Sequence, residues 1–293
     1  MKFDIKHTLQ SSLQSSILIL KLVIPLYIFA DVLIYFGWLD YISFIFEPIT
    51  TILHLPAQTA LALCAGIFLN IYAAIAFAAP LGLTPYEWTI LGMFLGICHS
   101  MLIESAIMKK LGISFRYAFS LRLSMAFLAV IPLYFMPLSW FSSNIIANTS
   151  KREIYDSFSL MLENSIYGSL LLSLKVILLI VSIIFLMDFI KSTKIVQEYQ
   201  KKVSTSFSII AGLILGITYG AGILINEAES GALSKKEIFY IGTFLMICHS
   251  IIEDTLLFVI FGANYAVLVS IRIVYAFFFS YILLKIFCRN DCK

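Results

Sequence analysis

Two short polar motifs interrupt long apolar runs of this chain and carry side chains well suited to chemistry. The first is Cys98-His99-Ser100, and the same three residue types recur 150 positions later as Cys248-His249-Ser250. Histidine titrates near neutral pH and is a common metal ligand, and cysteine thiolates select the softer metals. Ionisable groups inside apolar segments are costly and mark functional sites by default. The two motifs therefore predict a site that binds a solute, relays protons or coordinates a metal ion.

Carboxylates follow both motifs and enlarge the candidate site. Glu104 follows the first motif, whereas Glu253 and Asp254 follow the second, so the second half is the more acidic. In a continuous helix His249 and Glu253 would share one face, because they are four residues apart. The predicted substrate-binding residues are His99, Ser100, Glu104, His249, Ser250, Glu253 and Asp254, with Asn70, Tyr219 and Asn226 from the preceding apolar segments.

Two other interpretations of these residues stay open. Soft and borderline ligands would suit a transition metal. The candidates for that site are Cys98, His99, Cys248, His249 and Glu253. Alternatively, the polar groups only join neighbouring helices through hydrogen bonds.

An arginine follows each motif at the same spacing. Arg122 and Arg272 are 150 positions apart and lie in the next apolar segment of each half. They would neutralise Glu104 and Asp254, since a paired charge costs far less to bury than a lone one. Binding of an anionic substrate is the alternative role.

Composition predicts a polytopic membrane protein in contact with the lipid bilayer. The 293 residues are 61% hydrophobic and only 13% charged, against about 25% charged in soluble domains. The net charge of +3 is small, and we expect no nucleic-acid partner. No G-x-x-x-x-G-K-[ST], H-E-x-x-H or G-x-S-x-G motif occurs, so we expect neither an enzyme nor a bound cofactor.

The chain divides into two homologous halves. Residues 1–138 form the first, 139–165 a polar connector and 166–293 the second. Apart from the motifs, Ala65-Gly66 matches Ala211-Gly212 at an offset of 146. The apolar segments are about 17–36, 57–80, 86–108, 117–137, 166–190, 206–226, 238–261 and 265–288. An all-α fold with four apolar segments in each half follows.

The distribution of Lys and Arg predicts how these segments cross the bilayer. If all eight cross, eight basic residues lie inside and seven outside. If the two Cys-His-Ser segments are instead re-entrant hairpins, the count becomes eleven against four. The positive-inside rule favours the second arrangement. We therefore predict an inverted repeat with about six transmembrane helices, two re-entrant hairpins and both termini in the cytoplasm, in the cell inner membrane.

The blocks FLGICHSMLIES and FLMICHSIIEDTLLFVIFGAN, each followed by an arginine-bearing helix, resemble the Gate, or nucleoside-recognition, domain of membrane proteins. That family includes concentrative nucleoside transporters, the gate regions of ferrous-iron permeases and spore-maturation membrane proteins. The resemblance implies a transporter of a small polar solute, nucleoside-like or carboxylated. A divalent-metal permease and a non-transporting assembly partner are the alternatives, and homo-oligomerisation stays open.

Overall fold

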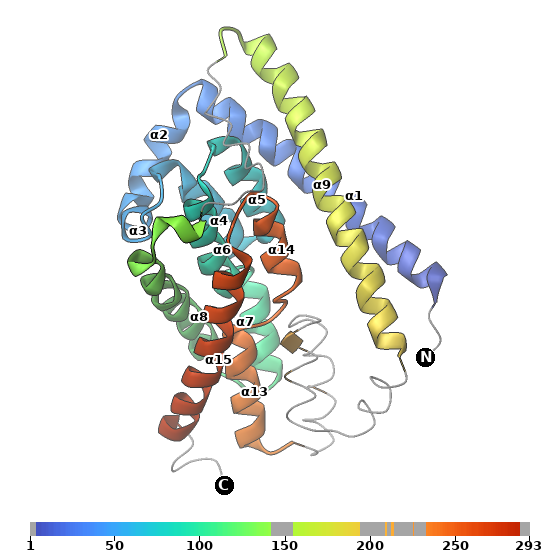
Figure 1. Cartoon of the computed structure of the whole chain (residues 1–293), viewed down its shortest axis with the longest axis vertical. Coiled ribbons are helices and arrows are strands. Elements are labelled where there is room, and N and C mark those ends of the chain that lie inside the picture. Colours follow the sequence, from blue (N-terminus) through green and yellow to red (C-terminus); the bar gives the residue numbers. More distant parts are fainter. Residues whose placement is uncertain are drawn as a thin grey trace.

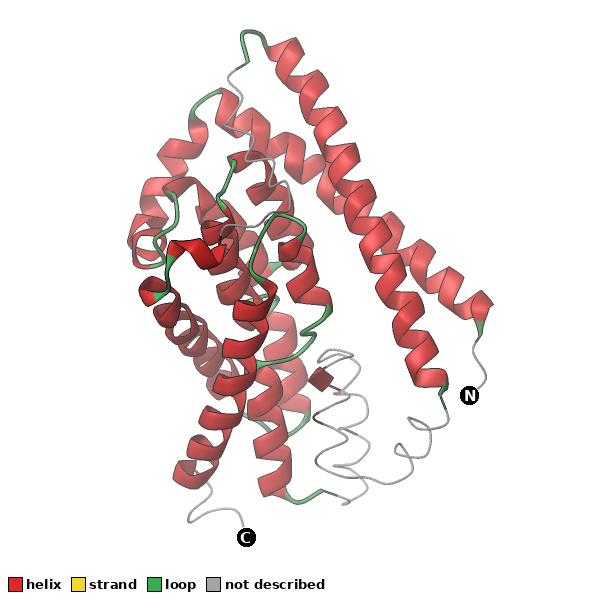
Figure 2. Cartoon of the chain, in the orientation of Figure 1, coloured by secondary structure: helices red, strands yellow, loops and turns green. Residues whose placement is uncertain are grey.

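The computed structural model describes residues 4–141, 155–193 and 233–287, with the single positions 209, 212, 213 and 225. Within these ranges the chain is helical and contains no strand (Figure 2). The α-helices are α1 (Ile5–Tyr35), α2 (Trp38–Ser43), α3 (Glu47–Ile52), α4 (Ala60–Phe68), α5 (Ile71–Ala78), α6 (Pro85–Cys98), α7 (Met101–Lys110), α8 (Phe115–Val130), α9 (Phe158–Ser192), α13 (Lys235–Ile247), α14 (Glu253–Val259) and α15 (Tyr265–Phe287). Short 3-10 turns are η1 (Phe44–Phe46), η2 (Ala57–Thr59), η3 (Ala79–Leu81), η4 (Ile131–Phe135) and η5 (Leu138–Phe141).

Five helical stretches of the described ranges are long and apolar enough to cross a membrane. They are Ile5–Tyr35, Pro85–Lys110, Phe115–Phe135, Phe158–Ile190 and Tyr265–Phe287. The prediction of an all-α polytopic membrane protein is confirmed.

The two longest helices, α1 and α9, pack against each other and run in opposite directions along one side of the molecule (Figure 1). Near one end of this pair the Ser165 hydroxyl donates to the buried Asp31 carboxylate at 2.6 Å. Near the other end the Thr8 hydroxyl donates to Asp188 at 2.8 Å. Hydrogen bonds of this kind fix helix pairs where lipid supplies no hydrophobic driving force.

The helices α4 and α5 form a hairpin within the segment predicted to cross as 57–80. Each has nine residues or fewer, or about 14 Å at 1.5 Å per residue, which is too short to span. They pack against each other, and Asn70 at the tip caps α5 by accepting from the Ala73 backbone N–H. Irregular backbone at such a tip must be buried in protein. Ser100 covers part of this tip, since its N–H donates to the Gly66 carbonyl at 2.9 Å, whereas the Phe68 and Leu69 side chains are exposed.

The prediction that the Cys-His-Ser segments are re-entrant hairpins is wrong for the first motif. Helices α6 and α7 follow one another along α8 (Figure 1), and together they form the single 26-residue stretch Pro85–Lys110. Helices α13 and α14 follow one another along α15 in the same way, but in the opposite direction. The motifs are therefore breaks inside long helices. The sequence could not distinguish the two arrangements, because the tip of a re-entrant hairpin and a break in a transmembrane helix have the same pattern of polar residues between apolar ones.

Local sequence explains both the starts and the breaks of these helices. A capping box begins α6 at Thr84 and α13 at Ser234, each with a glutamate three residues later, which satisfies backbone donors that a helix start leaves free. Ser100 and Ser250 then adopt positive φ angles of 47° and 44°. L-residues rarely adopt this left-handed conformation, and it cannot continue a right-handed helix.

Two glycines that align in the sequence repeat, Gly66 and Gly212, pack against leucines that also align in it. A Cβ on Gly66 would lie 2.6 Å from the Leu95 side chain, and one on Gly212 would lie 2.5 Å from Leu245. Only glycine allows this close approach of backbone to side chain. The two contacts agree with the alignment that pairs Gly66 with Gly212 and residue 95 with residue 245.

Candidate functional site

The two helix breaks meet in the interior and bring six polar side chains together, here called the central cluster: His99, Glu104, Arg122, His249, Asp254 and Arg272. All six are buried. The rings of His99 and His249 have centroids 5.3 Å apart. The sequence prediction that residues of the two motifs form one site thus agrees with the geometry.

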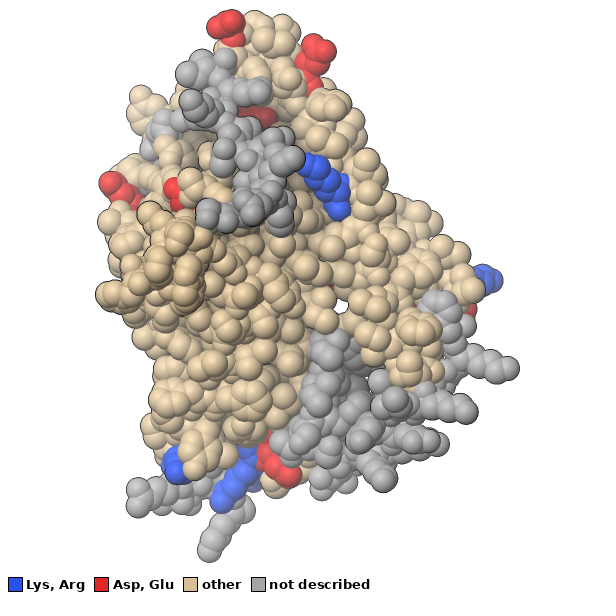
Figure 3. All heavy atoms as spheres, viewed as in Figure 1, with Lys and Arg blue, Asp and Glu red and all other residues tan. Residues whose placement is uncertain are grey.

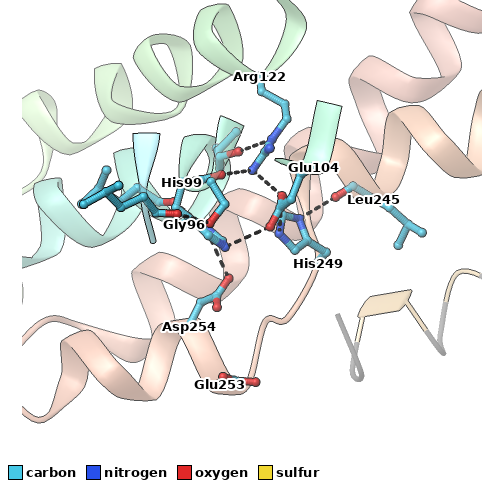
Figure 4. Close-up of polar contacts among 12 residues, drawn as sticks. Gly96, His99, Glu104, Arg122, Leu245, His249, Glu253 and Asp254 are labelled. Atoms are coloured by element: carbon cyan, nitrogen blue, oxygen red, sulfur yellow. Dashed lines mark hydrogen bonds and ion pairs between the residues drawn. The ribbon is translucent and has the colours of Figure 1, made fainter. Parts of the chain in front are cut away.

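Glu104 is the centre of this cluster (Figure 4). Its carboxylate lies 3.2 Å from Nε2 of His99 and 3.2 Å from Nε2 of His249. The Arg122 guanidinium approaches the same carboxylate at 2.6 Å. A single acidic side chain from the first half therefore contacts histidines of both halves.

Asp254 occupies the matching position of the second half but stands farther from its neighbours. Its carboxylate lies 3.8 Å from Arg272 and 4.0 Å from Nδ1 of His99. Aspartate is one methylene shorter than glutamate, which explains the longer distances. The predicted pairing of each arginine with one carboxylate agrees with these contacts, tight for Arg122 and loose for Arg272.

The two arginines also hold the broken helix ends together. Arg122 donates from Nε to the Ile97 carbonyl and from its terminal nitrogen to the His99 carbonyl, each at 2.8 Å. Arg272 donates at 2.7 Å to the carbonyls of His249 and Gly96. The last carbonyls of a helix lack partners within it, so both guanidinium groups cap the end of α6, and Arg272 also ties it to the segment that follows α13.

The reach of Arg272 into the other half depends on Gly96. A Cβ at that position would lie 3.1 Å from a terminal nitrogen of Arg272. The matching residue of the second half is Met246, and Arg122 bonds carbonyls of its own half instead. The cluster is therefore not symmetric, although its residues match in sequence.

Both histidines are fixed by the same backbone contact. Nδ1 of His99 lies 2.8 Å from the Leu95 carbonyl, and Nδ1 of His249 lies 2.8 Å from the Leu245 carbonyl. A carbonyl oxygen can only accept a hydrogen bond, so each Nδ1 carries the proton. In the neutral imidazole Nε2 is then a free acceptor, and both Nε2 atoms point at Glu104.

Glu253 does not share a helix face with His249, contrary to the expectation for a continuous helix. The chain leaves the helix after Ile247 and starts α14 only at Glu253, so the spacing of four has no meaning here. Glu253 instead accepts a hydrogen bond of 2.8 Å from the Tyr72 hydroxyl. Tyr72 lies two residues after the predicted residue Asn70, and this contact places it beside the predicted residue Glu253.

The remaining predicted residues have varied settings. Asn70 caps α5, and the Ser100 hydroxyl donates to the Leu69 carbonyl at 3.1 Å. Cys98 and Cys248 are buried free thiols, and the metal-compatible group found among the described residues contains neither of them. Ser250 is half-buried at its break. Tyr219 and Asn226 lie outside the described residues.

Comparisons with known proteins support the membrane assignment alone. No protein-family model matches the chain, so the resemblance to the Gate family stays a prediction. The chain is similar to the uncharacterized membrane protein YvoD of Bacillus subtilis (strain 168), at 26% identity over 268 residues, 86% of this chain and 85% of that protein. No solved structure matches.

Proposed function

We propose that this protein is a membrane transport protein. It carries a small polar solute across the bilayer through a site at the interface of two halves that are related as an inverted repeat. The observation that carries the proposal is the meeting of two oppositely directed, broken helices at a buried cluster of charged and histidine side chains. Discontinuous helices with polar groups at the break form the binding sites of many secondary transporters. Such groups are too costly inside a membrane to be kept without use.

Charge distribution supports an orientation with both termini in the cytoplasm of an inner-membrane protein. We count α4–α5 as a hairpin, α13–α14 as a crossing and the matching segment 206–226 as not crossing, in line with the sequence repeat. Thirteen basic residues then fall on the side of the termini and two, Lys151 and Arg152, on the other. The count for the predicted arrangement with re-entrant Cys-His-Ser segments is eleven against four, so the positive-inside rule favours the revised arrangement more strongly. Basic side chains gather at the end of the molecule where α13 begins and α15 ends, and acidic ones lie mostly at the opposite end (Figure 3).

Half-buried polar groups beside the central cluster are the proposed solute contacts. They are Asn70, Tyr72, Ser100, Ser250 and Glu253. Hydroxyl and amide groups with one carboxylate acceptor suit a solute rich in hydroxyl donors. Glu253 would repel a carboxylate, so a nucleoside-like solute fits this set better than a carboxylated one.

Uptake into proteoliposomes tests the proposal. The purified chain is reconstituted, and radiolabelled nucleosides, nucleobases and small carboxylates are offered on either side. We expect saturable uptake of one class that is strongly reduced in Glu253→Gln and unchanged in Glu163→Gln, a matched change at an exposed position of α9. Absence of uptake for every class by folded protein would refute transport of such solutes and favour the assembly partner.

A divalent-metal permease is a second candidate, favoured by one specific observation. His99, Glu104 and His249 place ligand atoms within 4.8 Å of one another. The same liposomes, loaded with a metal-sensitive dye, test this candidate directly. Dye response that requires His249 would favour it over solute transport.

A further inference from the structure

The central cluster contains three potential ligand atoms that converge from three separate segments. They are Nε2 of His99 at the end of α6, the carboxylate of Glu104 in α7, and Nε2 of His249 between α13 and α14. Their side chains are at most 9% exposed. The site is therefore built by the fold and is shielded from water.

The imidazole orientation is that of a metal ligand. Each Nδ1 donates to a backbone carbonyl at 2.8 Å, and a hydrogen bond of this kind fixes the ring and tautomer of metal-binding histidines. Nε2 of His249 is fully buried and faces Glu104 without the geometry of a hydrogen bond. In the neutral form each imidazole directs its Nε2 lone pair at the Glu104 carboxylate, and a cation between these groups would replace that repulsion with attraction.

The distances match the size of a coordination shell. Zinc bonds of about 2.0–2.1 Å to nitrogen, in tetrahedral geometry, place neighbouring ligand atoms about 3.3 Å apart. Nε2 of His99 lies 3.2 Å from one Glu104 oxygen, Nε2 of His249 lies 3.2 Å from the other, and the three ligand atoms lie within 4.8 Å of one another. Side-chain movement of about 1.5 Å or less would bring all three atoms to the spacing of a tetrahedral shell.

We infer that His99, Glu104 and His249 bind one divalent transition-metal ion of the Zn²⁺ or Co²⁺ type. Two imidazoles and one carboxylate suit these ions, whereas Mg²⁺ and Ca²⁺ prefer oxygen ligands alone. Three protein ligands leave a fourth position for water or another small ligand. Glu104 serves both the ion and Arg122, because a carboxylate offers two oxygens. The bound ion would tie the break of one half to the break of the other, and this holds whether or not the protein moves a solute.

Metal binding to the purified full chain tests the inference. The protein in detergent is stripped with a chelator and titrated with Co²⁺ and then Zn²⁺, with calorimetry for stoichiometry and visible absorption for cobalt geometry. We expect one ion per chain and an intense tetrahedral cobalt spectrum that Zn²⁺ displaces. His249→Ala and Glu104→Gln should each weaken binding by more than the roughly 10- to 100-fold that loss of a supporting hydrogen bond costs at a metal site.

Matched variants keep the test decisive. His7→Ala changes an exposed histidine of α1 and should leave affinity unchanged. His249→Gln retains an amide donor for the Leu245 carbonyl and replaces His249→Ala if that variant does not fold. No binding at one ion per chain, or equal binding by the variants that lack a ligand, overturns the inference. Solute uptake by a protein that binds no metal ion would overturn the inference and leave the proposed function standing, whereas metal binding without any uptake would do the reverse.

Discussion

Arg122 has two tasks in the central cluster, and substitutions can separate them. It forms an ion pair with Glu104 at 2.6 Å and donates to the carbonyls of Ile97 and His99 at 2.8 Å. Glu104→Gln removes the charge of its partner but leaves both carbonyl bonds. Arg122→Lys keeps the charge but lacks the fork that reaches two carbonyls and a carboxylate together. Arg122→Met removes the ion pair and both carbonyl hydrogen bonds.

The expected costs follow from burial of the pair. Breaking a buried ion pair from one side costs about 3–5 kcal/mol, so Glu104→Gln should cost about 3 kcal/mol or more. Each buried carbonyl left without a donor costs about 1–3 kcal/mol. Arg122→Lys should therefore cost about 1–3 kcal/mol, and Arg122→Met at least about 5 kcal/mol, close to the whole stability of many domains. The double variant Glu104→Gln with Arg122→Met buries no lone charge and should be more stable than Arg122→Met alone.

Thermal unfolding in detergent measures this order. For chains of 150–250 residues each kcal/mol shifts the melting temperature by about 2–4 °C, so Glu104→Gln should lower it by on the order of 10 °C. Arg116→Met, an exposed change near the start of the same helix, is the control and should shift it little. Two results would refute the separation of ion pairing from carbonyl hydrogen bonding. One is a double variant that is no more stable than Arg122→Met; the other is an equal loss of stability in Arg122→Lys and Arg122→Met.

Other substitutions test the asymmetry and the direction of the broken helices. Asp254→Glu, although conservative, should lower the melting temperature, because the longer side chain brings a second carboxylate toward Glu104; an unchanged value would contradict this. Gly96→Ala should reduce stability through Arg272, by roughly the 1–3 kcal/mol of one lost carbonyl bond, and Arg272→Lys should lessen the added effect of the alanine. Single cysteines at Lys236 and Leu138 should react with impermeant reagent from opposite sides of sealed vesicles, and labelling from one side would refute α13–α14 as a crossing.

The fold class was predictable because composition and segment length dominate it. A chain that is 61% hydrophobic with repeated apolar runs has few options besides a helical membrane protein. Which apolar segments cross the membrane was harder to predict from the sequence. Hydropathy does not distinguish a hairpin such as α4–α5, with its tip at Asn70, from one continuous crossing of equal length.

The membership of the site was predictable to a similar degree. His99, Glu104, His249 and Asp254 stood out because ionisable groups are rare inside apolar segments, and the offset of 150 paired them. Their partners depended on three-dimensional geometry. The contact between Glu253 and Tyr72 joins residues 181 positions apart, and the spacing of four between His249 and Glu253 misled because the helix breaks between them.

Two halves that share the Cys-His-Ser motif and meet at their breaks face an electrostatic problem at the centre. Matched residues approach one another there, so glutamate in both halves would bring two carboxylates together in a buried site, where like charges repel strongly. The chain avoids this by using Glu104 in one half and the shorter Asp254 in the other. Glu104 then reaches both histidines at 3.2 Å, while Asp254 stays 3.8 Å from Arg272. One carboxylate at the centre, faced by two imidazoles and balanced by Arg122, gives a site able to hold a single cation, which two identical halves could not form without that clash.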